Sequence, residues 1–483
     1  MSKLEITTVQ DEPPDEVSQN EEKPPSQGIY SSTTAYRNAS PAITHLSVNN
    51  LGSKKTKTTR KIQNILPFFP LSEDKSHQGW TSWQWQIRHR IKTVRQLENF
   101  FAGAAIQSDI ENAIHRFPMA ITPYYASLIR KMEPSDPVYR MAVPMTDELH
   151  DPPFLLDDPL EEEHDMPVPG LVHRYPDRAL IMVTSMCAMY CRHCTRKRVA
   201  GQREVNISQP QLKRIINYLV NHPEIHDVIL SGGDPLTLRT ESLEKIIAAV
   251  RSVPSVDIIR IGTRTPVTMP MRITEELVTM LKNYQPLWVN THFNHPNEIT
   301  AESRAACARL VDAGIPMGNQ TVLLRGVNDN PQVMEELLRG LITMRVRPYY
   351  LYQCDLVRGV EHFRTPLSRG IEIMEYLRGR ISGFAIPTFV VDAPGGGGKI
   401  PVLPNYLITS SPTHTVLRNF EGMLVSYPEP IATGRMEVQS FQTKNKTIES
   451  INPTVFDLAT GRALKIEPMT SLRKKRRSRR SSA

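Results

Sequence analysis

Short hydrophobic runs alternate with amphipathic stretches over residues 179–392. The runs have the length and the Val, Ile, Leu and Tyr content of buried strands, and the stretches repeat apolar residues every three or four positions, as helices do. The predicted strands lie at 179–184, 226–230, 257–262, 287–293, 317–324, 347–354 and 385–392, and the predicted helices at 208–221, 241–252, 274–283, 300–313, 331–344 and 368–380. This alternation predicts an α/β fold with a parallel sheet. Because no Gly-x-Gly-x-x-Gly turn follows the first strand, a partial (β/α) barrel is favoured over a dinucleotide-binding sheet.

The pattern changes on both sides of this region. Residues 1–60 are rich in Pro, Ser, Thr and Asn with little apolar periodicity, so we expect a disordered leader. We expect a mostly helical region over 61–170, which ends in a proline-rich acidic segment. The barrel should then cover 171–404, followed by a C-terminal extension over 405–470 and a disordered basic tail over 471–483.

Polar motifs follow most of the predicted strands directly. They read CAMYCRHC, SGGDP, GTRTP, THFNHP, CDL and DAPGGGGK in chain order. The carboxyl ends of the strands of a (β/α) barrel form one face. Motifs spread over more than 200 residues should therefore converge on one pocket.

Composition excludes several classes of function. The chain is 40% hydrophobic without a run of roughly 18 apolar residues, so no membrane partner is expected. The acidic first 25 residues lack the features of secretory and transit peptides, which favours the cytoplasm. Most of the net charge of +8 lies in the Arg- and Lys-rich tail at 473–480, which is typical of a solvated end. No nucleic-acid partner is expected.

Three of the five cysteines are spaced as Cys187-x-x-x-Cys191-x-x-Cys194. The small number and the clustering of the cysteines argue against a disulfide framework and favour thiolate ligands in a reducing compartment. A zinc site would need a fourth protein ligand, whereas this spacing lets a short loop ligate three irons of a cubane. The fourth iron would be left open, as radical chemistry with S-adenosylmethionine requires.

Two further motifs suggest cofactors. Lys399 follows four glycines in DAPGGGGK, but the pattern lacks the Gly and Ser or Thr of a nucleotide loop. A lysine on a flexible arm suits a Schiff base with pyridoxal phosphate, and a solvated lysine on an exposed turn is the alternative. Arg174 and Arg178, before the first predicted strand, suit a phosphate dianion, although surface arginines are also common.

Together these motifs resemble the lysine 2,3-aminomutase family of radical S-adenosylmethionine enzymes, from about Trp80 to Pro430. The resemblance implies a [4Fe-4S] cluster on the three cysteines, S-adenosylmethionine, and pyridoxal phosphate on Lys399. It implies that the cofactor-binding residues are Lys399, Arg174, Tyr175, Arg178, His193, Ser231, Gly232, Gly233, Asp234, His292 and Gln320. In SGGDP the glycines would also let the backbone approach the methionyl end of the nucleotide closely.

The resemblance also implies the substrate. Arg196 would pair with the α-carboxylate of an amino acid, and Asp355 and Asp392 would receive the distal ammonium of lysine. A buried ammonium needs compensating negative charge, which two carboxylates supply. The implied reaction moves the amino group of L-lysine from Cα to Cβ through a 5′-deoxyadenosyl radical. Arginine is an alternative substrate because a guanidinium also suits a carboxylate pair.

Three features depart from the family pattern. Known bacterial members bind zinc at the subunit interface, but this chain has Asn330 at one ligand position and no cysteine beyond Cys354, so no interface zinc is expected. The leader and the basic tail also lie outside the pattern. We expect a homo-oligomer without zinc and an electron donor such as flavodoxin or ferredoxin. A catalytically retired relative that uses its tail as a nucleic-acid tether is the rival reading.

Overall fold

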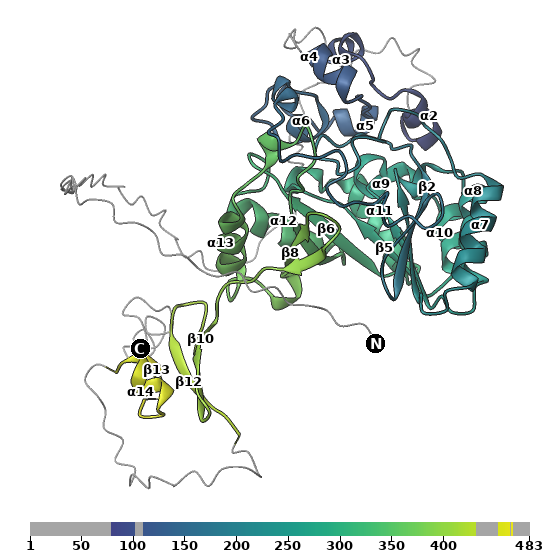
Figure 1. Ribbon diagram of the computed structural model, residues 1–483. Helices are drawn as coiled ribbons and strands as arrows, with labels where there is room; N and C mark the ends of the chain where they lie inside the picture. Colours follow the sequence, from purple (N-terminus) through teal and green to yellow (C-terminus); the bar gives the residue numbers. More distant parts are fainter. Residues whose placement is uncertain (1–78, 102–109, 431–452, 464, 467–483) are drawn as a thin grey trace, which may run out of the picture. The chain divides into compact units, whose positions relative to one another are not determined.

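The computed structural model describes residues 79–101, 110–430, 453–463 and 465–466 (Figure 1). The predicted leader and the basic tail lie outside these ranges, as does part of the C-terminal extension. No helix in the described ranges is both long and apolar enough to cross a membrane.

A nine-stranded sheet with its strands in sequence order forms the centre of the fold. Strands β2 to β8 pair in parallel, and β1 and β9 pair antiparallel at the two edges. The strands are β1 (Leu171–Tyr175), β2 (Arg178–Thr184), β3 (Asp227–Gly232), β4 (Ile258–Gly262), β5 (Leu287–Thr291), β6 (Met317–Leu323), β7 (Arg347–Gln353), β8 (Thr388–Ala393) and β9 (Gly398–Pro401). The predicted α/β fold with a partial barrel is confirmed, and β1 and β9 are additions that the hydrophobic pattern did not predict.

Six helices follow the parallel strands and lie on the outside of the sheet (Figure 1). They are α7 (Gln209–Val220), α8 (Thr240–Arg251), α10 (Glu275–Lys282), α11 (Ala301–Asp312), α12 (Pro331–Thr343) and α13 (Leu367–Leu377). All were predicted, with ends that differ by at most a few residues. Ser208, Thr274 and Asn330 fix the starts of three helices because each side chain accepts a hydrogen bond from a backbone N–H of the first turn.

Short helical turns fill the loops at the carboxyl ends of the strands. They are η2 (Pro235–Thr237), α9 (Thr265–Thr268), η3 (Pro270–Arg272), η4 (Pro296–Glu298) and η5 (Glu361–Phe363). A further turn, η6 (Gly383–Ala385), lies in the loop that leads from α13 into β8.

Side chains along the parallel strands point alternately into the hydrophobic core and into the interior of the barrel, which we call the lumen. Val228 and Leu230 of β3 and Ile261 of β4 are fully buried. Ile229 and Ser231, which alternate with the first two, line an internal cavity. Because successive side chains of a strand point to opposite faces, one face packs into the core and the other is left for the site.

The N-terminal region packs against the loop that carries the three cysteines. Its elements are α2 (Trp83–Arg88), α3 (Val94–Phe100), α4 (Ile110–Arg116), α5 (Pro123–Ala126), α6 (Pro137–Ala142) and η1 (Thr146–Leu149). Residues 185–198, which we call the cysteine loop, hydrogen bond to this region through the N–H groups of Tyr190 and Arg192. The acceptors are the carbonyls of Ala120 and Met141, at 3.0 and 2.9 Å. Residues 151–170, the acidic connector, then lead to β1 through turns.

The C-terminal extension contains a second, four-stranded antiparallel sheet. Its strands are β10 (Leu407–Ser410), β11 (His414–Arg418), β12 (Leu424–Pro428) and β13 (Lys465–Ile466), and the helix α14 (Val455–Ala459) precedes the last strand. The sequence analysis assigned no fold to this segment.

Candidate functional site

A cavity of about 380 Å³ lies at the carboxyl ends of the parallel strands, and every site residue proposed from the sequence lines it. These residues are Arg174, Tyr175, Arg178, Cys187, Cys191, His193, Cys194, Arg196, Ser231, Gly232, Gly233, Asp234, His292, Gln320, Asp355, Asp392 and Lys399. The polar motifs after the strands therefore meet in one place, as the barrel geometry predicted.

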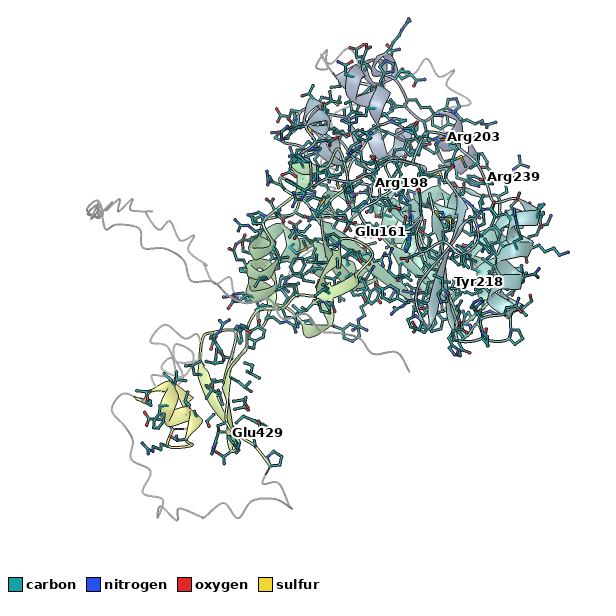
Figure 2. All side chains as sticks on the ribbon, in the orientation of Figure 1. Glu161, Arg198, Arg203, Tyr218, Arg239 and Glu429 are labelled. Carbon is teal, nitrogen blue, oxygen red and sulfur yellow. The ribbon has the colours of Figure 1, made fainter. Side chains whose placement is uncertain are left out.

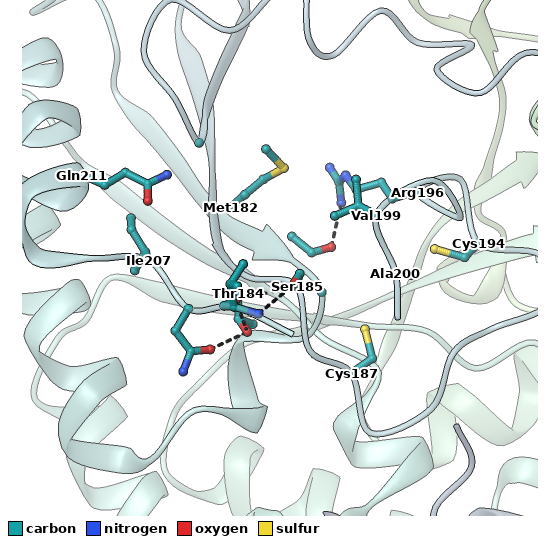
Figure 3. A pocket seen from close by; sticks show the side chains of 15 residues that line it. Met182, Thr184, Ser185, Cys187, Cys194, Arg196, Val199, Ala200, Ile207 and Gln211 are labelled. Carbon is teal, nitrogen blue, oxygen red and sulfur yellow. Dashed lines mark hydrogen bonds between the residues drawn. The ribbon is translucent and has the colours of Figure 1, made fainter. Parts of the chain in front are cut away.

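The three cysteines stand on the cysteine loop directly after β2. The sulfur atoms of Cys187 and Cys194 point into the same space, at a smaller pocket of about 190 Å³ (Figure 3). Burial raises the pKa of the Cys187 thiol well above its usual value, and the negative charges of Asp234 and the other cysteines raise it further. Burial likewise raises the pKa of Cys194 to about 11. A bound cation would offset the cost of burying the thiolates of Cys187 and Cys194.

The donor set fits an iron–sulfur cluster better than a single ion. In the ranges that the structure describes, no three His, Cys, Asp or Glu side chains are placed to share one metal ion. A cluster differs because each thiolate binds a different iron, so the sulfur atoms need not meet at one point. Cys187, Cys191 and Cys194 would be those three ligands.

Two arginines that the sequence analysis did not single out hold the cysteine loop. Arg90 donates to the carbonyl of Cys187 at 2.7 Å and pairs with Glu204. Arg264, from the motif GTRTP, donates to the sulfur of Cys191 at 2.7 Å and pairs with Glu298 at 2.6 Å. These contacts join segments more than 70 residues apart, so no local sequence pattern could have indicated them.

The motif SGGDP packs tightly under the start of the cysteine loop. Gly232 has a φ of +107°, and a Cβ atom there would lie 2.5 Å from the carbonyl oxygen of Thr184. A Cβ atom on Gly233 would lie 2.4 Å from the carbonyl oxygen of Met186. The Asp234 carboxylate accepts hydrogen bonds from Thr263 and from the backbone of Arg264. The glycines thus have a packing role beside the nucleotide contact proposed from the sequence.

His193, His292 and Gln320 line the same cavity from three different strand ends. Burial, together with the charges of Arg264 and Arg196, lowers the pKa of His292 to about 4. Burial also lowers the pKa of His193 well below its usual value. Both imidazoles are therefore neutral at pH 7, when they can take part in uncharged hydrogen bonds with a nucleotide. Gln320 donates to the hydroxyl of Tyr352 at 3.4 Å.

Lys399 lies on β9, in register with Asp392 on β8. Its Nζ atom is 2.9 Å from one carboxylate oxygen of Asp392 and 5.3 Å from the centre of the Tyr352 ring. Its backbone N–H donates to the hydroxyl of Tyr175 at 2.9 Å. Gly395 and Gly396 have positive φ, which lets the chain turn tightly between the two strands. The motif therefore forms a β-hairpin that presents Lys399 to the cavity.

The acidic connector pairs with Arg174 and Arg198, whereas Arg178 packs on the ring of Tyr175. Arg174 donates to Asp165 at 2.6 Å and to the carbonyl of Leu160. Arg178 lies over the ring of Tyr175, with 4.4 Å between the guanidinium carbon and the ring centre. Arg198, labelled in Figure 2, pairs with Asp158 at 3.0 Å on the same connector. These contacts fix both the connector and the arginines at the edge of the cavity.

Arg196 and Asp355 stand where the cysteine loop meets the strand ends. Arg196 (Figure 3) forms a two-pronged ion pair with Glu162, with a shortest distance of 2.6 Å. Its other end donates to the hydroxyl of Ser231 and to the carbonyl of Gly232, both at 3.3 Å. Asp355 accepts a hydrogen bond from Thr195 at 2.7 Å. Burial raises the pKa of Asp355 to about 6. Glu162 and Thr195 are functional neighbours that the sequence analysis missed.

Comparison with known proteins adds independent information. The family model described as Lysine-2,3-aminomutase matches residues 374–483, and that of the Radical SAM superfamily matches residues 181–338. An L-lysine 2,3-aminomutase from Clostridium subterminale is 52% identical over 409 residues, which cover 84% of this chain and 98% of that protein. One from Fusobacterium nucleatum is 48% identical over 89% of this chain and 99% of that protein. A glutamate 2,3-aminomutase from Clostridioides difficile is 43% identical over 78% of this chain and 89% of that protein.

Proposed function

The chain belongs to the lysine 2,3-aminomutase family of radical S-adenosylmethionine enzymes, and from this premise we propose that it converts L-lysine to β-lysine. Family membership implies a [4Fe-4S] cluster, S-adenosylmethionine and pyridoxal phosphate. When bound, the first two supply the radical that starts the reaction, and pyridoxal phosphate supplies conjugation for the migrating nitrogen.

The observation that carries the choice of substrate is the pair of carboxylates, Asp355 and Asp392, beside Lys399 in one cavity. Two carboxylates in a buried place favour a substrate with a distal cation, because the cation offsets their repulsion and their desolvation. A glutamate side chain would add a third negative charge there. This supports lysine over the substrate named for the glutamate 2,3-aminomutase relative.

The proposed role of Lys399 is to hold pyridoxal phosphate covalently until the substrate amine replaces it. In the described structure its ammonium pairs with Asp392 at 2.9 Å. With Nζ of Lys399 used to hold the cofactor, the Asp392 carboxylate would be without this ammonium partner when a substrate enters, and it could then receive the distal ammonium of that substrate. The phosphate would be held by Arg174, Tyr175 and Arg178, which line the same end of the cavity.

The proposed role of Arg196 is to bind the substrate α-carboxylate. Glu162 holds one edge of its guanidinium, so the orientation of the other edge is set before the substrate arrives. Such preorganisation reduces the entropy lost on binding. Arg196 lines the same cavity as Cys194, Asp355 and Asp392, so a substrate carboxylate bound to it would lie in the cavity that holds both the cysteines and the carboxylate pair.

A substrate panel tests this proposal. The protein is reconstituted without oxygen with iron, sulfide, pyridoxal phosphate, S-adenosylmethionine and a reductant, and is given lysine, arginine or glutamate in separate reactions. We expect β-lysine from lysine and no product from glutamate. Lys399→Ala should abolish turnover without loss of iron, while Lys282→Ala, at an exposed position on α10, should be as active as the wild type. If only arginine is converted, the protein is an arginine 2,3-aminomutase. If the cluster is intact and lysine is not converted, the proposed substrate is refuted.

We also propose a flavodoxin or ferredoxin as reductant, a cytoplasmic location, and a homo-oligomer without interface zinc. The clustered cysteines support the cytoplasmic location, and the absence of cysteine beyond Cys354 supports an interface without zinc.

A further inference from the structure

Three charged side chains form a fully buried group beside the cysteine loop, and we call Glu148, Arg192 and Lys197 the charge triad. Glu148 lies on η1 of the N-terminal region, and the other two lie on the cysteine loop. Arg192 donates to both carboxylate oxygens of Glu148, at 2.9 and 2.6 Å, and Lys197 donates to one of them at 2.7 Å. The three side chains are at most 4% exposed. None of them belongs to the site described above.

Lys197 is held at a fixed place by its other contacts. Its ammonium also donates to the carbonyl oxygens of Arg192 and Gly359, both at 2.9 Å. It lies 4.1 Å from the centre of the Phe117 ring. Three hydrogen bonds use all three N–H groups, and the ring face adds a cation–π contact. The charge of Lys197 is therefore confined to one position behind the cysteine loop.

The charge triad carries one more positive charge than negative charge. Arg90 and Arg264, which hold the same loop, each pair with a carboxylate of their own. Glu148 instead serves two cations, and in the part of the chain that the structure describes no second carboxylate pairs with either of them. A surplus charge in the interior costs free energy unless an opposite charge lies nearby.

The thiolates of the three cysteines would supply such a negative charge on the same loop. Lys197 follows Cys194 by three positions. Its ammonium donates at 2.9 Å to the carbonyl of Arg192, the residue directly after Cys191, so its charge is held against the segment that carries the cysteines. Three thiolates outweigh the positive charge of an iron–sulfur core, and reduction adds another electron. Net charge near a cluster is one of the factors that set its reduction potential.

We propose that the surplus positive charge of the charge triad is a counter-charge that raises the reduction potential of the cluster. Lys197 supplies this charge, Arg192 neutralises Glu148, and Glu148 keeps the two cations together. The inference rests on the proposed function, since it requires a cluster on the three cysteines. Lys197 acts on the cluster through its charge and its position, without binding iron or substrate.

The test is the midpoint potential of the reconstituted cluster, measured by potentiometry with electron paramagnetic resonance. Lys197→Met keeps the Arg192–Glu148 pair and removes the surplus charge, so the potential should become more negative. We expect the ratio of reduced to oxidised cluster at a fixed potential to fall roughly tenfold, a shift of about 59 mV for one electron. Adding Glu148→Gln to this variant leaves Arg192 alone and restores the surplus charge. The double variant should therefore return close to the wild-type potential.

A purely structural role predicts a different result. The double variant loses more contacts than Lys197→Met, so its potential would then lie at least as far from the wild type. The control is Glu335→Gln combined with Lys197→Met, because Glu335 is a carboxylate on α12 that pairs with Arg339. This control should keep the lowered potential.

Each outcome separates the inference from the proposed function. An unchanged potential in Lys197→Met, or no recovery in the double variant, would overturn the counter-charge. Should Lys197→Met assemble no cluster, Lys197→Gln replaces it, since its amide still donates to the two carbonyls, and the same criteria apply. Failure of the wild-type protein to bind iron would instead contradict the proposed function.

Discussion

The proposed role of Asp355 predicts that substrate binding depends on pH. Burial raises its pKa to about 6, although the hydrogen bond from Thr195 opposes this rise. The negative charge of Asp392 raises the pKa as well. Because the pKa is raised, the carboxyl group is charged above pH 6 and becomes neutral as the pH falls below it. A neutral Asp355 cannot attract the distal ammonium of the substrate.

We therefore expect kcat/KM for lysine to fall about tenfold per pH unit below pH 6, since kcat/KM reports ionisation of the free enzyme. Asp355→Asn should remove this acid limb. It should also lower kcat/KM at pH 7.5 roughly 30-fold or more, because one partner of a buried charge pair is lost. Such a loss corresponds to about 2–5 kcal/mol of transition-state stabilisation. Initial rates from pH 5 to 8 provide the measurement. An acid limb near pH 6 that persists in Asp355→Asn would assign the ionisation to another group.

Several individual residues could be predicted from the sequence because they belong to local motifs. Cys187, Cys191 and Cys194 share one loop, and Lys399 follows its glycines directly. Glu162 could not be predicted, because it reaches Arg196 from 34 residues earlier, in a connector with many acidic residues. Nothing in the spacing of those acids shows which of them the fold brings to the cavity.

The turn after β3 shows how an element positions the site. Gly232 and Gly233 let the end of β3 pass beneath the carbonyl groups that begin the cysteine loop. Glycine has no Cβ atom, so β3 and the cysteine loop can approach more closely here than they could with any other residue at these two positions. The position of Cys187 relative to the lumen thus depends on this turn.

We expect Gly232→Ala to destabilise the fold by about 1–3 kcal/mol, because a φ of +107° is strained for alanine and its Cβ would meet the Thr184 carbonyl. The same displacement should reduce the iron content after reconstitution. Gly383→Ala is the matched control, since a Cβ atom at Gly383 would meet nothing within 4 Å. Urea unfolding and iron analysis of both variants give the comparison. Equal stability and iron content in Gly232→Ala would refute the close-packing account.

Elements with a strong hydrophobic signal were predicted, and short polar ones were not. Strands β3 and β4 carry enough apolar residues to be recognised, because helices cover their outer face, while the residues of the inner face line the cavity. Strand β1 mixes His173, Arg174 and Tyr175 with two apolar residues, and β9 has only four residues. Their pairing depends on neighbouring strands, so no regular alternation of apolar residues marks them.

At the scale of the whole molecule, the barrel rule explains why so much of the site could be predicted. Once the strands are parallel and sequential, every motif at a carboxyl end must face the same cavity. The links between the N-terminal region and the cysteine loop could not be predicted in this way. Glu148 meets Lys197 across 49 residues, and only the folded chain shows that one carboxylate serves two cations.

The transfer of the α-nitrogen of lysine to Cβ is the central claim, and an isotope experiment tests it most directly. The reconstituted protein is given L-lysine that carries ¹⁵N only on the α-amino group and ¹³C at Cα and Cβ, and the product is examined by NMR. The account predicts β-lysine in which ¹⁵N is bonded to Cβ and coupled to no other carbon of the labelled pair. A product with unlabelled nitrogen on Cβ, or lysine recovered unchanged with an intact cluster and both cofactors bound, would contradict it.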